Sequence, residues 1–259
     1  MVKIKIVFLH IICITVLTAF TQVGGILWLI AVFTSLKLKK KKRYIFPIIY
    51  LIFNLLIIPP IASIFGREKL PVFDKNLKPV NIVYPLLFRN YVTKNLYIVL
   101  HKSANNLSKK QIQITYLDAN FPFFKGFPLL PHRSHNDGKK IDISFMYKDI
   151  KGQSTNKKPS YSGYGAYVKT ANHSVKNCIK RGYWQYDFPK HLTFRIDKSI
   201  QFNKTATRAI IKEFLTHTLT EKIFIEPYLK KDLHLTSSKI RFHGCKAVRH
   251  DDHIHLQIK

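Results

Sequence analysis

The chain ends in His250-Asp251-Asp252-His253-Ile254-His255-Leu256-Gln257-Ile258-Lys259, where histidines and aliphatic residues alternate. Successive side chains of a β-strand point to opposite faces. A strand over these residues therefore places His253 and His255 on one face and the aliphatic residues on the other. Two imidazoles on one strand face, with two carboxylates just before them, are suited to form half of a zinc site. The other half has to come from elsewhere in the chain.

The stretch Ser134-His135-Asn136-Asp137-Gly138-Lys139-Lys140-Ile141-Asp142 supplies the remaining ligand types. Gly138 lets the chain turn, and the alternation over residues 140–145 predicts a strand in which Asp142 faces away from Ile141. One histidine, one aspartate and a later histidine give three protein ligands and leave a fourth position for water. This set is typical of catalytic zinc, whereas structural zinc sites use four protein ligands.

The two motifs, Ser-His-x-x-Gly-x-x-x-Asp and His-Asp-Asp-His-x-His, resemble those of the penicillin-insensitive murein endopeptidases. That family belongs to a group with lysostaphin, the D-Ala-D-Ala metallopeptidases and hedgehog domains. The resemblance implies that His135, Asp142 and His255 bind one Zn²⁺ per chain. It also implies that His253 is the catalytic histidine and that His250 lies in the site.

The resemblance covers roughly residues 111–259 and includes Ile223–Lys230, which is similar to the family's strand-then-helix segment. The chain departs from the family pattern at Lys140, where these endopeptidases usually carry an acid. The residues before His250, among them Cys245, also lack the family's Trp-rich approach. Both departures bear on substrate recognition more than on metal binding.

Zinc hydrolysis is the chemistry that this ligand set predicts. A bound Zn²⁺ lowers the pKa of its water to ~7 and polarises the scissile carbonyl. His253 is expected to take the water's proton or to stabilise the tetrahedral oxyanion, and His250 either bonds the oxyanion or supports the site. Asp251 and Asp252 are expected to bond an imidazole and fix its tautomer. His132 is expected near the ligands, on the substrate side or in a structural role.

The remaining histidines show no partner spacing, so we expect no role for them in the site. None of the glutamates adjoins the histidine cluster in the sequence, which favours histidine-based hydrolysis over a mechanism with a glutamate base. The histidines in question are His101, His173, His191, His217, His234 and His243, and the glutamates are Glu68, Glu213, Glu221 and Glu226.

The first 66 residues contain no acid and form two apolar runs around a basic loop. Residues 6–36 and 44–65 are each long enough to cross a bilayer, and six of the seven residues 37–43 are Lys or Arg. They predict a transmembrane hairpin in the bacterial cell membrane, with a cytoplasmic loop and an extracytoplasmic domain after it. Alternatively, the start is a cleavable signal peptide. Residues 23–36 would then form the first helix, with the loop on the same side.

The plan of the chain after the hairpin is a lead-in or linker over residues 67–90 and a zinc peptidase domain over residues 91–259. Alternating strands outside a few helices indicate an α+β fold, an antiparallel sheet with flanking helices. Strands are predicted at residues 111–117, 140–145, 222–225, 239–242 and 253–258. Helices are predicted at residues 171–181 and, with Asn203 as N-cap, at residues 205–216. Residues 91–100 start a strand or a helix, and Pro227 starts a short helix.

Two of the three cysteines, Cys178 and Cys245, lie in the predicted extracytoplasmic domain, where a disulfide can persist. We therefore predict a bond between them. Cys13 falls in the first apolar run and is expected to be a packing residue. The chain has no Cys-x-x-Cys pair, which excludes a cysteine zinc finger.

The chain is strongly basic, with 43 Lys and Arg against 14 Asp and Glu and a formal charge of +29. A basic domain outside the membrane suits anionic envelope polymers or lipid headgroups. A nucleic-acid partner is not favoured, because the sequence shows neither an aromatic-and-basic motif nor a recognition helix.

Together these features predict a membrane-anchored zinc metallopeptidase that hydrolyses peptide bonds in peptidoglycan, in its stem peptides or cross-links. The alternative is a zinc-containing domain that binds cell wall or another ligand without hydrolysis, as hedgehog-type relatives do. The presence of His253 beside a full set of three ligands favours catalysis.

Overall fold

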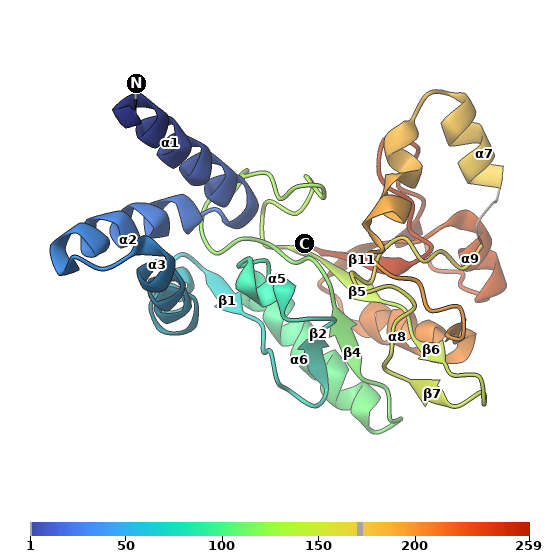
Figure 1. Cartoon of the computed structure of the whole chain (residues 1–259). Helices are drawn as coiled ribbons and strands as arrows, with labels where there is room; N and C mark the ends of the chain where they lie inside the picture. Colours follow the sequence, from blue (N-terminus) through green and yellow to red (C-terminus); the bar gives the residue numbers. More distant parts are fainter. Residues whose placement is uncertain (1, 170–172) are drawn as a thin grey trace. The chain divides into compact units, whose positions relative to one another are not determined.

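The computed structural model describes residues 2–169 and 173–259. The chain forms two compact units, each built from several segments (Figure 1). The first unit comprises Met1–Leu70, Val83–Lys94 and Asp118–Gly138, and the second comprises Pro71–Ile82, Asn95–Leu117 and Lys139–Lys259.

The first unit begins with apolar helices. They are α1 (Val2–Thr21), α2 (Gly24–Leu38), α3 (Lys42–Ile52), a π-helical turn (Phe53–Ile57) and α4 (Ile58–Ile64). Two stretches, Ile4–Thr21 and Lys42–Ile64, are long and apolar enough to cross a membrane, and α2 is shorter. Many of their large apolar side chains are exposed, including Phe8 and Leu56, as lipid-facing residues would be. Signal sequences and buried helices can have the same length and composition, so the transmembrane hairpin stays a prediction.

The run predicted as a single span over residues 6–36 is divided into two helices, because the chain breaks between α1 and α2. Gln22 has a φ of 67°, in the left-handed region that ends helices. The Thr21 hydroxyl accepts a hydrogen bond from the Gly24 backbone N–H at 2.8 Å and donates one to the Leu17 carbonyl at 2.6 Å. The apolar run continues on both sides of these residues, so the hydropathy of the sequence does not reveal the break.

The rest of the first unit holds the loop that carries His135. β1 (Arg67–Lys69) pairs antiparallel with β3 (Tyr91–Thr93). Gly138 donates its backbone N–H to the Asn120 side chain at 2.9 Å, and its carbonyl accepts from the Thr93 N–H at 2.8 Å. Gly138 has a φ of 80°, and a Cβ there would come within 1.1 Å of the Arg67 guanidinium. The positive φ and this close contact both favour glycine at the turn.

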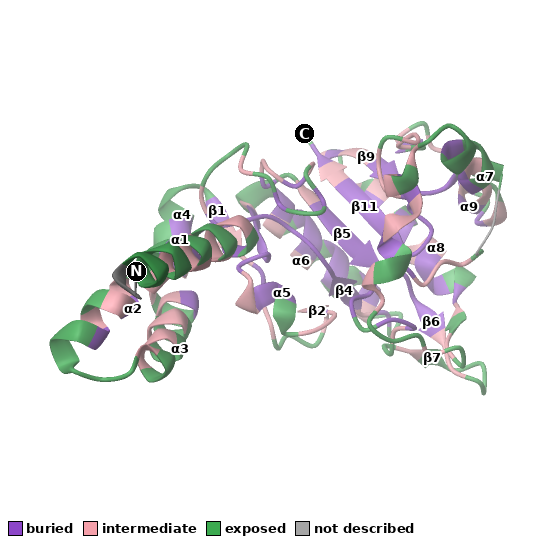
Figure 2. Cartoon of the chain, turned by 45° about the horizontal axis from the view of Figure 1, so that its top comes forward, coloured by how far each residue is buried: buried purple, intermediate pink, exposed green. Residues whose placement is uncertain are grey.

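The second unit is built on a mixed six-stranded sheet in the order β10-β9-β11-β5-β4-β2. Its central strands are almost fully buried (Figure 2). The outer pairs, β10 with β9 and β2 with β4, are parallel, which corrects the prediction of an antiparallel sheet. The strands are β2 (Leu77–Pro79), β4 (Ile114–Tyr116), β5 (Lys140–Ser144), β9 (Thr220–Phe224), β10 (Ile240–Arg241) and β11 (His253–Ile258).

Helices and a small second sheet complete this unit. α6 and α8 lie side by side, joined by a 2.8 Å hydrogen bond from Asn106 to Glu213 and a 2.9 Å contact between Ser103 and His217. The helices of this unit are α6 (Lys94–Ser108), α7 (His173–Lys180), the 3-10 helix η2 (Trp184–Leu192), α8 (Lys204–Thr216) and α9 (Pro227–Asp232). The small sheet contains β6 (Tyr147–Lys148), β7 (Ser154–Thr155) and β8 (Gln201–Phe202). The short helix α5 (Val83–Leu86) belongs to the first unit.

Several predicted elements appear with different boundaries. Residues 91–100, predicted to start either a strand or a helix, contain both, since β3 is followed directly by α6. The strand predicted over residues 111–117 is shortened to β4, and the helix predicted over residues 171–181 is α7, with residues 171 and 172 outside the described part. The lead-in over residues 67–90 contains β1, β2 and α5. The disulfide predicted between Cys178 and Cys245 is formed.

The N-cap predicted for α8 is confirmed, because the Asn203 side chain accepts a 3.1 Å hydrogen bond from the Ala206 N–H. We predict that Asn203→Ala lowers the free energy of unfolding by about 1 kcal/mol, measured by denaturant unfolding of the full chain in detergent. Asn203→Asp is the matched control: it keeps the cap acceptor but loses the amide that contacts Ser154. Equal destabilisation by both changes would contradict a stabilising cap.

Candidate metal centre

The antiparallel register of β5 and β11 brings two of the predicted ligands together. His255 lies directly opposite Asp142, and His253 lies opposite Ser144. The Nδ1 atom of His255 is 2.8 Å from Oδ1 of Asp142. The alternate residues of both strands, Ile143 among them, are fully buried in the core. The strand alternation read from the sequence is thus confirmed on both strands.

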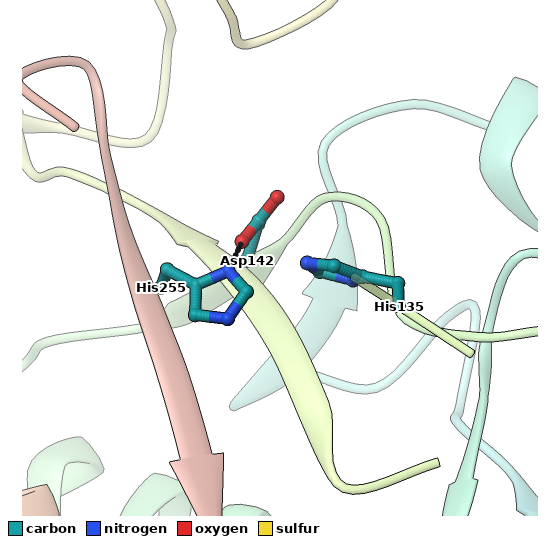
Figure 3. A group of neighbouring side chains, drawn as sticks. All are labelled: His135, Asp142 and His255. Atoms are coloured by element: carbon teal, nitrogen blue, oxygen red, sulfur yellow. Dashed lines mark hydrogen bonds and ion pairs between the residues drawn. The ribbon is translucent and has the colours of Figure 1, made fainter. Parts of the chain in front are cut away.

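His135 completes the predicted ligand set. One ligand atom from each of His135, Asp142 and His255 lies within 4.8 Å of the other two. Figure 3 shows the three side chains facing one another. Each is at most 2% exposed. This buried group could hold a metal ion.

The bonding of His135 suits metal ligation. Its Nδ1 lies 2.8 Å from the Ala119 carbonyl, which can only accept a hydrogen bond. Nδ1 therefore carries the proton, and the lone pair is on Nε2. Metal-ligating histidines commonly bond a backbone carbonyl through the other ring nitrogen in this way. Two imidazoles and one carboxylate form a donor set that fits Zn²⁺ and leaves a position for water.

Tyr164 holds the second oxygen of the carboxylate. Its hydroxyl donates a 2.7 Å hydrogen bond to Oδ2 of Asp142, and its ring packs edge-on against His253 at 5.0 Å between centroids. Tyr164 is only 3% exposed, and no spacing pattern in the sequence predicts this contact. The positive φ values of Gly163 and Gly165 turn the loop inward on either side of it.

His253 lies beside the ligands with its orientation fixed. Its Nδ1 contacts Oδ1 of Asp252, and the Gly165 N–H donates to the other oxygen of that carboxylate. The Nε2 atom lies 3.7 Å from Oδ1 of Asp142. Burial opposes a charge on the imidazole, but Asp142 and Asp252 outweigh it and raise the pKa of His253 to about 9. Asp252 thus makes the imidazole contact that the sequence predicted for it.

Two more imidazoles, those of His250 and His243, lie close to these residues. The His250 ring is 4.9 Å from that of His253 and 5.6 Å from that of His255. Burial, together with the neighbouring histidines, holds the pKa of His250 well below its usual range. His243 was expected to have no role, but its ring stacks on Phe224 at 4.2 Å and is 5.3 Å from that of His250. No spacing pattern links His243 to the motif, so the sequence could not indicate it.

Glu226 also reaches the cluster, although no glutamate adjoins the histidines in the sequence. It is fully buried, and its carboxylate accepts a 3.3 Å hydrogen bond from the His250 backbone N–H. Its own N–H donates to the His250 carbonyl at 3.0 Å. Burial raises the pKa of this carboxyl. Because both bonds are to the main chain, Glu226 supports the segment that carries His250.

Asp251 does not bond an imidazole as predicted; it binds Arg249. This arginine is fully buried, and its Nε lies 2.7 Å from Oδ1 of Asp251 while another guanidinium nitrogen lies 3.0 Å from Asp187. The Tyr228 hydroxyl donates to Asp251 at 2.8 Å, and the guanidinium carbon lies 3.7 Å from the centroid of the Tyr167 ring. These contacts fix the backbone immediately before the His253 strand.

His132 lies next to His135, with 5.7 Å between ring centroids. Its Nδ1 is 2.8 Å from Asp118, whose other oxygen forms a 3.0 Å ion pair with Arg89. Burial opposes ionisation of Asp118, but Arg89 and His132 outweigh it and hold the pKa below its usual range. His132 therefore belongs to a buried charged group beside a ligand.

The chain matches no protein-family model and none of the curated proteins. The site's geometry therefore has to support any functional conclusion.

We predict that the full chain in detergent binds one Zn²⁺, and that His135→Ala, Asp142→Ala and His255→Ala each weaken zinc binding by more than about 100-fold. The loss of a ligand should exceed the 10–100-fold effect typical of changes to residues that only orient ligands. Competition titration with a zinc-sensitive dye measures these affinities. His101→Ala, which removes a histidine far along the chain from both motifs, should change nothing. Unaltered affinity in the three ligand variants would exclude this cluster as the zinc site.

We also predict that Arg249→Met lowers the free energy of unfolding by about 3 kcal/mol or more, because it leaves the Asp251 carboxylate buried without its cation. Denaturant unfolding of the full chain in detergent measures this change. Lys190→Met is the matched control, since Lys190 also pairs with Asp187, at 2.8 Å, but is half exposed. An exposed pair contributes less than about 1 kcal/mol. A similar small effect for both variants would show that the buried pair does not stabilise the segment.

Proposed function

We propose that the chain is a membrane-anchored zinc metallopeptidase that hydrolyses peptide bonds in peptidoglycan. The observation that supports this most directly is the convergence of His135, Asp142 and His255, with His253 beside Asp142. Three ligands with an adjacent acid–base group form the arrangement expected for metal-assisted hydrolysis. The motif resemblance to the murein endopeptidases supplies the substrate class.

The bound Zn²⁺ would supply a water with a pKa of ~7 and would polarise the scissile carbonyl. Because Asp142 and Asp252 favour the charged imidazole, His253 would donate the proton on Nε2 to the tetrahedral oxyanion, while Asp252 engages Nδ1. Asp252 would also stabilise this imidazolium. Tyr164 would keep the Asp142 carboxylate in its ligating orientation through the hydroxyl bond to Oδ2.

His250 is suited to assist His253 in the reaction. Its low pKa keeps the imidazole neutral near pH 7, so it would act as a hydrogen-bond donor to the oxyanion or as a support for His253. The Glu226 contacts to its backbone hold it in place for either role.

The proposed location follows from the amino-terminal helices. Two of them have the length and composition of membrane spans, and the basic residues 37–43 favour a cytoplasmic loop. The catalytic residues would then lie outside the cytoplasm, where the Cys178–Cys245 disulfide is stable. The excess of Lys and Arg suits the anionic polymers of the cell wall.

A zinc domain that binds without hydrolysis is the second candidate. Its specific support is the burial of the ligands, each at most 2% exposed, together with the proximity of His250 to His255. A fourth protein ligand would close the site and give the coordination of a structural zinc ion.

Peptide release from purified peptidoglycan by the full chain in detergent tests the proposal, with zinc content measured on the same samples. We predict that His253→Ala keeps its zinc and loses about 100-fold or more in kcat, as expected for a group that stabilises the oxyanion. His255→Ala should lose both zinc and activity.

His217→Ala serves as the control, because this histidine packs on α6 through Ser103, and it should retain zinc and activity. A zinc-loaded parent protein that releases no peptide from several wall types would favour the binding domain. A parent that binds no zinc would contradict both candidates.

A further inference from the structure

The outer side of α7 exposes apolar and basic side chains together. Lys176, Ile179 and Lys180 are spaced at i, i+3 and i+4, so they share one face of the helix. Arg181 follows them, and Trp184 begins η2 and is 68% exposed. We call these five residues the α7 face.

The buried side of α7 packs within the second unit. Val175 and Cys178 are buried and pack with Tyr186. Cys178 is also bonded to Cys245, which joins the helix covalently to the segment before His250. The helix thus already has one apolar side in the core. Ile179 lies at the edge of that side, one turn after Val175, and it and Trp184 are additional apolar groups that stay exposed.

The charge around the α7 face is positive. Residues 173–200 contain six Lys and Arg against two Asp. Asp187 is engaged by Arg249 and Lys190, and Asp197 accepts hydrogen bonds from Ser199. The two carboxylates of this region therefore have partners other than the cations of the α7 face.

We propose that the α7 face docks on the anionic lipid surface of the membrane, an inference that rests on the proposed membrane anchorage. Tryptophan is enriched at membrane interfaces, where its ring lies at the headgroup level. Basic residues are attracted to anionic lipids, each contributing roughly a fivefold gain in affinity near the surface. The aliphatic side chain of Ile179 adds apolar area that can enter the acyl boundary.

An anionic wall polymer would complement the same charges but not the apolar groups. It offers no hydrocarbon phase for Ile179, whereas a lipid surface satisfies both kinds of side chain. The anchor would also raise the effective concentration of lipid at the α7 face, because the first unit is part of the same chain. Three cations and two exposed apolar side chains are then sufficient for docking without a deep pocket.

Tryptophan fluorescence tests the proposal, because the chain has only Trp28 and Trp184. In a Trp28→Phe background, Trp184 is the single indole. The full chain is reconstituted in nanodiscs of phosphatidylcholine, with or without phosphatidylglycerol, and with brominated acyl chains as quenchers. We expect blue-shifted, quenched emission with phosphatidylglycerol and an exposed, unquenched spectrum without it.

Lys176→Gln, Lys180→Gln and Arg181→Gln combined should reduce docking affinity by on the order of 100-fold and so return the emission to the exposed spectrum. The matched control combines Lys109→Gln, Lys110→Gln and Lys212→Gln. It removes the same charge at exposed positions of the turn after α6 and of α8, and it should leave quenching intact.

Unquenched Trp184 in anionic nanodiscs, or equal quenching in both lipid compositions, would overturn the proposal. An emission shift with a soluble wall polyanion but not with lipid would also overturn it and would assign the α7 face to the wall. The fluorescence result does not depend on peptide release, so failure of docking and failure of the proposed hydrolase are separate outcomes.

Discussion

The pairing register of β5 with β11 is the constraint on which the site depends. It sets His255 opposite Asp142 and, two residues earlier, His253 opposite Ser144. A shift of one residue would turn both imidazoles into the apolar core and bring Ile254 to the site face. The buried aliphatic residues on the other face resist that shift, because each would have to leave the core. The same hydrophobic alternation therefore maintains both the core and the ligand geometry.

Bringing so many ionisable groups into the interior requires that each has a partner, since a partly satisfied buried network is costly. The carboxylates are distributed accordingly. Asp142 bonds Tyr164 and His255, Asp252 orients His253, and Asp251 neutralises Arg249. The consecutive acids Asp251 and Asp252 thus have different partners. Asp251 pairs with Arg249 and holds the chain in place, and Asp252 orients the His253 imidazole.

The sequence was informative where the determinants are local. Alternation predicted β5, β11 and the side on which the ligands lie, and a side-chain acceptor at Asn203 predicted the start of α8. It was uninformative where partners come from distant segments. Tyr164, Glu226 and His243 reach the site only through tertiary packing, and no spacing relates them to the two histidine motifs. The break at Gln22 was missed because a single left-handed residue leaves the hydropathy of the run unchanged.

The bond between Cys178 and Cys245 closes a loop with a sequence separation of 67 residues. By the chain-entropy model, closing a loop of this length stabilises the folded state by about 4 kcal/mol. The bond ends only five residues before His250, so the order of the site segment is linked to thiol oxidation. In the proposed topology that oxidation follows export. A newly made chain would then reach full stability only after crossing the bilayer, and the timing of its maturation would be set by the compartment in which the proposed substrate lies.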